Sequence, residues 1–118
     1  MRRFLIALLL LAGCSSKEEK AAQLTGGDPG LGKAAIRKYG CQTCHTISGV
    51  EGATGIIGPP LDRIGSRAFL AGQLENTPEN LMRWIREPQS IAPGTAMPDL
   101  RVTEKDGRDI AAYLYTLR

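Results

Sequence analysis

The sequence has few aromatic residues and almost no histidine. Two Phe, one Trp and three Tyr make up 5% of its 118 residues, and there is one His. A chain of this length has room for a single domain, which excludes multidomain and repeat architectures. Few large aromatic side chains leave that domain a thin core. We therefore expect a non-protein group to fill part of the interior.

An excess of charge of one sign is also missing. The 15 Lys and Arg residues face 12 Asp and Glu residues, for a formal net charge of +3. Two of the positive charges, Arg2 and Arg3, lie at the extreme N-terminus. Binding of a polyanion requires clustered positive charge. The composition therefore argues against nucleic acid as a partner.

The chain has no apolar run long enough to span a bilayer. Its longest run, Phe4 to Ala12, is shorter than the roughly 20 residues that a membrane-spanning helix needs. Two arginines precede this run, as in an export signal. It ends in Leu-Ala-Gly-Cys at positions 11–14, which resembles the lipobox of bacterial lipoproteins. The resemblance implies that residues 1–13 are a signal peptide that is removed, and that a diacylated Cys14 anchors the chain to a membrane. An ordinary secretory signal with an incidental cysteine is the alternative.

A folded domain is predicted to start after a linker. Residues 14–28 contain small and polar residues with little apolar periodicity, so we expect the lipidated cysteine to be followed by a flexible tether. The domain should then cover residues 29–118. Its first helix is predicted over residues 29–39, because Asp28 can cap it and Pro29 suits its first position, and Gly40 ends it.

Two further helices are predicted in the second half of the chain. Thr77 opens one helix, which Pro88 closes, and Thr103 opens another that carries an apolar stripe to the C-terminus. No alternating strand of convincing length is present, so the fold class is all-α. Loops rich in glycine and proline cover residues 40–65 and 89–100. Loops of this length in compact domains are usually functional.

The chemistry is concentrated directly after the first helix. Cys41, Cys44 and His45 form a C-x-x-C-H sequence, the attachment signature of c-type haem. Two cysteines three residues apart can reach both vinyl groups on one haem edge, and the adjacent imidazole then faces the iron. A dithiol redox motif would need a strand-to-helix setting that is missing here, and a structural zinc would need a fourth ligand. We therefore predict one covalently bound haem c.

A haem iron held by His45 has a second axial position. The candidates are Met97, Met82, water or nothing. Met97 lies in a proline-flanked loop that can present a thioether at a fixed point, whereas Met82 lies on a helix where packing explains it. Met97 is the predicted second iron ligand, and the alternative is that it only lines the haem pocket.

These residues carry a family resemblance that covers about residues 29–118. The order and spacing are similar to those of class I cytochromes c at Gly32, Cys41 to Thr46, Gly58-Pro59, Trp84, Pro88, Gly94, Met97-Pro98 and Tyr113. The runs from Gly65 to Arg67 and from Asn76 to Gln89 resemble most the cytochrome c domain fused to subunit II of bacterial haem-copper oxidases. That fused domain follows a copper-binding domain and membrane helices, so we expect a free-standing relative.

The resemblance also implies roles for individual residues. The carbonyl of Pro59 would accept a hydrogen bond from Nδ1 of His45, which fixes the imidazole tautomer. Arg67 or, as the second choice, Trp84 through its indole N–H would meet a haem propionate. Gly32 would face Tyr113 where the first and last helices cross.

With His45 and Met97 in both axial positions, the iron would have no open site for a substrate, so we expect an electron carrier rather than an enzyme, with no small-molecule substrate. It would carry single electrons between a quinol-oxidising complex and a haem-copper oxidase, on the outer, periplasmic face of the cytoplasmic membrane of a bacterium. Two alternatives remain: a haem subunit fixed in a respiratory complex, and a haem sensor or peroxidase in which Met97 dissociates.

The expected rim of the haem pocket carries little charge. Residues 41–60 contain Glu51 as their only charged residue, and residues 88–98 contain none. We therefore expect an exposed apolar patch for a partner rather than a ring of lysines. Its members would be Ile47, Val50, Ile56, Ile57, Ile91, Ala92 and Ala96.

Overall fold

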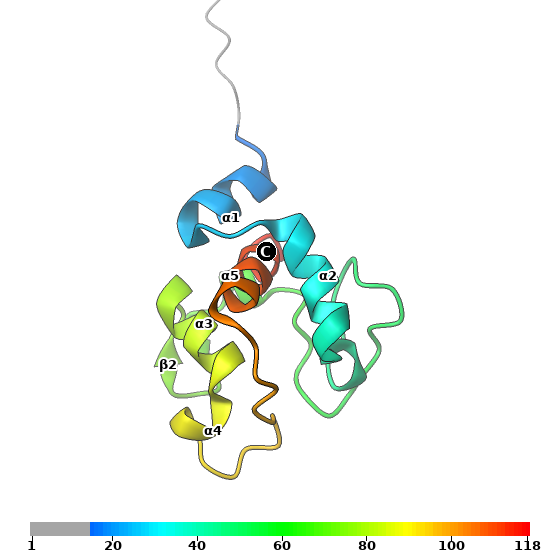
Figure 1. Ribbon diagram of the computed structural model, residues 1–118, viewed down its shortest axis with the longest axis vertical. Helices are drawn as coiled ribbons and strands as arrows, with labels where there is room; N and C mark the ends of the chain where they lie inside the picture. The colour runs from blue at the N-terminus through cyan, green and yellow to red at the C-terminus, as the bar shows by residue number, and fades with distance from the viewer. Residues whose placement is uncertain (1–14) are drawn as a thin grey trace, which may run out of the picture.

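The computed structural model describes residues 15–118, and the expected signal peptide and Cys14 lie outside this range. Figure 1 shows helices packed around a C-terminal helix, with long loops on one side. The described helices are α1 (Lys17–Thr25), α2 (Pro29–Tyr39), α3 (Pro78–Arg86), α4 (Pro88–Ile91) and α5 (Glu104–Leu114). Short 3₁₀ turns cover Cys41–Thr43 and Ile64–Ser66, and β1 (Phe69–Leu70) pairs antiparallel with β2 (Leu74–Glu75). None of the helices within residues 15–118 is long and apolar enough to cross a membrane.

The predicted all-α class and the three predicted helices are confirmed. Each begins at the expected cap: the side chains of Asp28, Thr77 and Thr103 accept hydrogen bonds from backbone N–H groups in the first turns of α2, α3 and α5. Gly40 ends α2 in the left-handed conformation at φ 75°. The small β1–β2 hairpin was not predicted, because strands of two residues are too short to show alternation.

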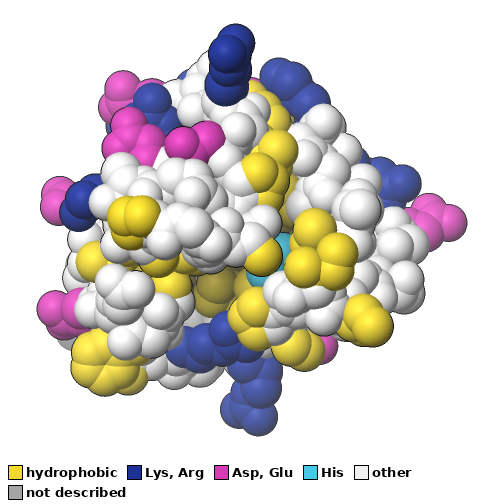
Figure 2. Space-filling model, turned by 90° about the horizontal axis from the view of Figure 1, so that it is seen from below, with side chains coloured by type: hydrophobic (Ala, Val, Ile, Leu, Met, Phe, Trp, Pro, Cys, Tyr) yellow, Lys and Arg dark blue, Asp and Glu magenta, His cyan; other side chains and the backbone are white. Residues whose placement is uncertain are grey.

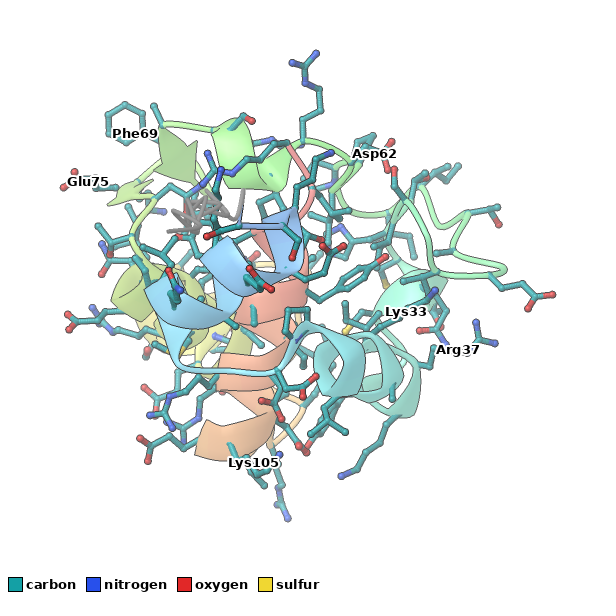
Figure 3. All side chains as sticks on the ribbon, turned by 90° about the horizontal axis from the view of Figure 1, so that it is seen from above. Lys33, Arg37, Asp62, Phe69, Glu75 and Lys105 are labelled. Atoms are coloured by element: carbon teal, nitrogen blue, oxygen red, sulfur yellow. The ribbon has the colours of Figure 1, made fainter. Side chains whose placement is uncertain are left out.

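The prediction of a flexible tether over residues 14–28 is wrong for most of that segment, because α1 forms there. Ser16 and Glu19 make a reciprocal capping box, with the Glu19 N–H 3.1 Å from Ser16 Oγ and the Ser16 N–H 3.3 Å from Glu19 Oε2. Ala21 is only 3% exposed against the rest of the core, and the Thr25 hydroxyl donates to the Ala21 carbonyl at 2.8 Å. Viewed from above, α1 lies across α5 (Figure 3). The folded domain therefore begins within the segment predicted as a linker.

Glycines bring α5 into direct backbone contact with its neighbours. A Cβ on Gly32 of α2 would lie 1.9 Å from the carbonyl oxygen of Asp109, and one on Gly27 would lie 2.3 Å from that of Arg108. The predicted crossing of α2 and α5 is thus present. Gly32, however, contacts Asp109 and Ile110 rather than the expected Tyr113. The Tyr113 hydroxyl instead donates to the carbonyl of Ser48 at 2.5 Å.

The core runs between α2, α3 and α5, where Ile36, Leu81 and Ile110 are almost fully buried. Two residues expected in an exposed patch belong to this core: Ile47 is 2% and Val50 6% exposed. They are buried because residues 46–54 fold back on themselves, with a bridge between Thr46 and Thr54 and an N–H of Ile47 bonded to the Ala53 carbonyl.

Candidate haem-binding site

A pocket of about 580 Å³ lies between the loop that follows α2 and the segment that follows α4. Its volume falls within the usual range of cofactor sites, about 300–1,000 Å³. Seen from below, the surface is hollowed there, with hydrophobic side chains around the histidine (Figure 2). The structure brings all the predicted site residues of the domain to this pocket: Cys41, Cys44, His45, Pro59, Arg67, Trp84 and Met97.

The end of α2 places the two cysteines at the pocket wall. After Gly40 the chain enters a 3₁₀ turn, in which the Thr43 N–H bonds to the Gly40 carbonyl and the His45 N–H bonds to the Cys41 carbonyl, each at 3.0 Å. Both thiols are half-buried and neither forms a disulfide. Burial raises the pKa of the Cys41 thiol, so this sulfur is protonated at neutral pH. Within residues 15–118, no three His, Cys, Asp or Glu side chains are grouped so that they could hold a metal ion.

The imidazole of His45 is fixed by the loop opposite the cysteines. Nδ1 lies 2.7 Å from the carbonyl oxygen of Pro59, and since a carbonyl can only accept, Nδ1 carries the hydrogen. Nε2 is thereby left as the unprotonated nitrogen that can bind a metal. Gly58 lies directly against the ring, and any larger residue would collide with it: a Cβ there would lie 2.3 Å from Cε1 of His45. The contact that the resemblance implied for Pro59 is therefore present, and Gly58 makes room for it.

Met97 reaches the same pocket from a different part of the chain. It lies in the segment after α4 and is half-buried among the lining residues. Met82, the other methionine considered as a ligand, packs against the hydrophobic core on α3 and does not line this pocket. Of the two, Met97 is the thioether that the fold places near His45.

Arg67 is the one Lys, Arg, Asp or Glu residue among the described residues that line the pocket. Its guanidinium donates to the Pro60 carbonyl, and its own carbonyl accepts a bond from Asn76 Nδ2 at 2.8 Å. The Tyr115 hydroxyl donates to Asn76 Oδ1 at 2.7 Å, and burial raises the pKa of Tyr115 to about 12. Trp84 lines the pocket from α3, and no hydrogen bond of its indole is present among the described residues.

Sequence reasoning missed two polar residues that support this site, Asn76 and Gln89. Their carboxamides bind backbone carbonyls of loops, Asn76 those of Ile64 and Arg67, and Gln89 those of Thr95 and Met97. The path of an irregular loop does not follow from periodicity. The one signal in the sequence was an Asn or Gln close to a loop without regular structure, because the backbone groups of such a loop need side-chain partners.

The donor set fits haem c. Two thiols with the spacing of thioether attachment, one imidazole with Nε2 available and one thioether from another segment all face a single, largely apolar pocket. Arg67 supplies a positive charge there, which suits the carboxylates of a haem. Two half-buried, free cysteines beside an apolar lining therefore suit a covalently held porphyrin.

Comparison with known proteins agrees with the site. The sequence model of the family described as Cytochrome c matches residues 30–118. Cytochrome c oxidase subunit 2 of Alkalihalophilus pseudofirmus is 38% identical over 88 residues, which are 74% of this chain and 25% of that protein. The subunit 2 proteins of Bacillus sp. (strain PS3) and Bacillus subtilis are 33% and 28% identical, each over 71% of this chain and 25% and 24% of their own lengths.

The chain thus spans about a quarter of the length of the curated relatives it matches. The family match, in contrast, covers the region from the second residue of α2 to the C-terminus, including every residue of the pocket. From its sequence and its fold, this chain belongs to the cytochrome c family.

Proposed function

We propose that this protein is a monohaem cytochrome c that carries single electrons to a respiratory oxidase. The observation that supports it best is the meeting of Cys41, Cys44 and His45 with Met97 in one pocket. When bound, haem c supplies a one-electron iron couple. Cys41 and Cys44 would form the two thioether attachments, and the imidazole of His45 and the thioether of Met97 would bind the iron. The apolar lining would exclude water, and Arg67 would offset propionate charge.

With both iron ligands supplied by the chain, His45 and Met97, the iron would have no open position, which would favour electron transfer over reaction with a small molecule. A thioether ligand raises the reduction potential, which suits a donor to a terminal oxidase. The relatives named as oxidase subunit 2 support the haem-copper oxidase as acceptor, and a quinol-oxidising complex would be the electron source.

The ligand assignment is tested with two methionine variants of the holoprotein. The oxidised protein should show the weak near-infrared band of sulfur-to-iron charge transfer, and Met97→Ala should abolish it. Met82→Ala is the matched control, since Met82 packs on the core outside the pocket, and should keep the band. Retention of the band in Met97→Ala would reject this ligand.

We further propose that a lipid on Cys14 holds the protein on the outer face of the bacterial cytoplasmic membrane. Only Ser15 separates Cys14 from Ser16, the cap of α1, so the folded domain would sit close to the bilayer. Figure 1 places α1 at one end of the domain, whereas the pocket opens at the other end, seen in Figure 2. An anchor at Cys14 would then leave the haem edge pointing away from the lipid.

Membrane anchoring and partner are tested together in native membranes. Wild-type protein should fractionate with the membranes, and Cys14→Ser should not, because it lacks the acylated sulfur. Solubilisation in mild detergent, followed by identification of copurifying haem-copper oxidase, distinguishes a free carrier from a fixed subunit. A soluble wild-type protein would contradict the anchor without affecting the haem assignment.

A further inference from the structure

The side chain of Gln89 binds three backbone groups of the segment that carries Met97. Nε2 donates to the carbonyls of Thr95, at 2.8 Å, and Met97, at 2.9 Å. Oε1 accepts from the N–H of Gly94 at 3.0 Å. Both amide hydrogens and the carbonyl oxygen are thus used on one short segment.

Gln89 itself is held in place. It is the second residue of α4, directly after Pro88, which is almost fully buried. Its own N–H donates to Asp99 Oδ1 at 3.2 Å, on the far side of the Met97 segment. The carboxamide is half-buried, so water competes less well for these hydrogen bonds than at an exposed position.

The segment from residue 93 to 98 has little other backbone support. It is irregular, with a proline at each end and Gly94 at φ 82°. Among the described residues, its backbone makes one hydrogen bond to other backbone groups, from the Thr95 N–H to the Ala92 carbonyl at 3.0 Å. Gln89 therefore replaces the backbone pairing that a helix or sheet would have given this segment.

We propose that Gln89 is a positioning residue that holds the Met97 thioether in the pocket. This inference rests on the proposed function, in which Met97 is an iron ligand. A ligand on a loosely held segment leaves the iron often, and the open position then admits external ligands. Gln89 makes that opening rare, which separates an electron carrier from a sensor or peroxidase with a dissociable methionine.

Variants of Gln89 test the proposal in the holoprotein. Gln89→Glu keeps the shape of the side chain but replaces both donors with a carboxylate that faces two carbonyls, and Gln89→Ala removes all three bonds. Gln73→Glu and Gln73→Ala are the matched controls, because Gln73 is exposed in the β1–β2 turn and its side chain has no hydrogen bond among the described residues.

Three readouts are measured on each variant. Carbon monoxide affinity of the reduced protein should rise roughly tenfold to a hundredfold in the Gln89 variants, the usual effect of losing buried hydrogen bonds. The near-infrared band should be weaker than in the wild type, because Met97 would leave the iron more often. The Gly94 N–H should lose its protection from hydrogen exchange. The Gln73 variants should match the wild type in all three.

A double variant separates positioning from general destabilisation. Once Met97 is gone there is no ligand left to position, so Gln89→Ala should add no further carbon monoxide affinity in a Met97→Ala background. An equal increase in both backgrounds would overturn the proposal, as would Gln89 variants with wild-type affinity and wild-type exchange at Gly94. If Met97→Ala itself leaves the band and the affinity unchanged, the ligand assignment fails rather than the role of Gln89.

Discussion

Two parts of this protein are held together by different means. The helical half consists of α1, α2, α3 and α5, and the loop half consists of the irregular segments around the pocket, between α2 and α3 and between α4 and α5. Where α1 and α2 meet α5, backbones touch directly at Gly27 and Gly32, and the contacts repeat along the helices. Around the pocket, in contrast, irregular segments are held by single side chains, among them Gln89 and Asn76. The helical half obtains its shape from packing. The loop half obtains its shape from specific hydrogen bonds around the space that the proposed haem would fill. The two halves should therefore respond differently to the same disturbance.

Removal of haem should have the largest effect, and mostly on the loop half. We expect Cys41→Ala/Cys44→Ala, produced without haem, to lose exchange protection over residues 40–61 and 89–100, because the pocket would then leave apolar lining exposed to water. Residues in α2 and α5 should keep part of their protection, and thermal unfolding should lack a sharp transition. Hydrogen exchange read by mass spectrometry checks this. Uniform protection with a sharp transition would show that the loop half folds without haem.

Gly32→Ala should be the most damaging single change in the helical half. The new methyl carbon would lie 1.9 Å from the carbonyl oxygen of Asp109, so α2 and α5 would have to separate. Overpacking of this kind costs about 1–3 kcal/mol and sometimes more. The measurement is the free energy of unfolding of the holoprotein in denaturant.

Gly30→Ala is the matched control, since Gly30 lies on the exposed side of the same helix. Its Cβ would meet only the Asp28 carboxylate, at 3.2 Å, and alanine favours a helix by up to about 1 kcal/mol over glycine. Equal losses in the two variants would contradict the role given to the α2–α5 contact.

Tyr115→Phe should have an intermediate effect, because Tyr115 connects the two halves. The variant leaves Asn76 Oδ1 without its donor, at a cost of about 1–2 kcal/mol. The pKa of Tyr115 is raised to about 12, above the value of about 10 in an unfolded chain. The folded state therefore holds this proton more tightly, and the contribution to stability is complete below about pH 10 and is lost as pH rises toward 12.

Denaturant unfolding of the wild type and of Tyr115→Phe between pH 8 and 12 measures this contribution of the Tyr115 hydroxyl to stability. The difference in unfolding free energy between wild type and Tyr115→Phe should shrink as pH rises through that window. A difference that stays constant with pH would show that the hydroxyl ionises as easily in the folded protein as in the unfolded chain.

The same contrast explains how far the sequence could predict this protein. Helices α2, α3 and α5 were predictable from their caps and periodicity, and the C-x-x-C-H sequence and Met97 from their chemistry. Helix α1 was missed because it buries little more than Ala21 and Thr25, which gives no apolar stripe. Burial of Ile47 and Val50, and the bonds of Gln89, depend on how loops fold back. A loop's path is fixed by contacts between residues far apart in sequence, and local pattern carries no trace of them.

Part of the expected apolar patch lies at the rim of the pocket. Ile56 is 91% and Ile57 69% exposed, and Ala96 is exposed as well, whereas Ile47 and Val50 belong to the core. Ile57 and Ala96 also line the pocket. Exposed apolar side chains next to a functional site mark a surface for a partner, so the loop half should supply the docking surface of this proposed carrier.

The smallest effect on stability, and the sharpest on function, is expected from Ile56→Asp. Because Ile56 is almost fully exposed, the charge should change the free energy of unfolding by no more than about 0.5 kcal/mol. Electron transfer to a membrane oxidase should nevertheless slow several-fold, since a carboxylate must lose its hydration when an apolar surface docks on it. Ala96→Glu should act in the same direction, and Arg83→Ala, on the exposed side of α3, should matter less. The proposed lipid anchor would keep the protein on the same membrane surface as its partner, where little long-range attraction is needed, so the wild-type rate should vary weakly between low and physiological salt. A steep decline of the rate with salt, with electron transfer slower in Arg83→Ala than in Ile56→Asp, would contradict the apolar docking surface. It would indicate instead a charged docking surface on the side of α3.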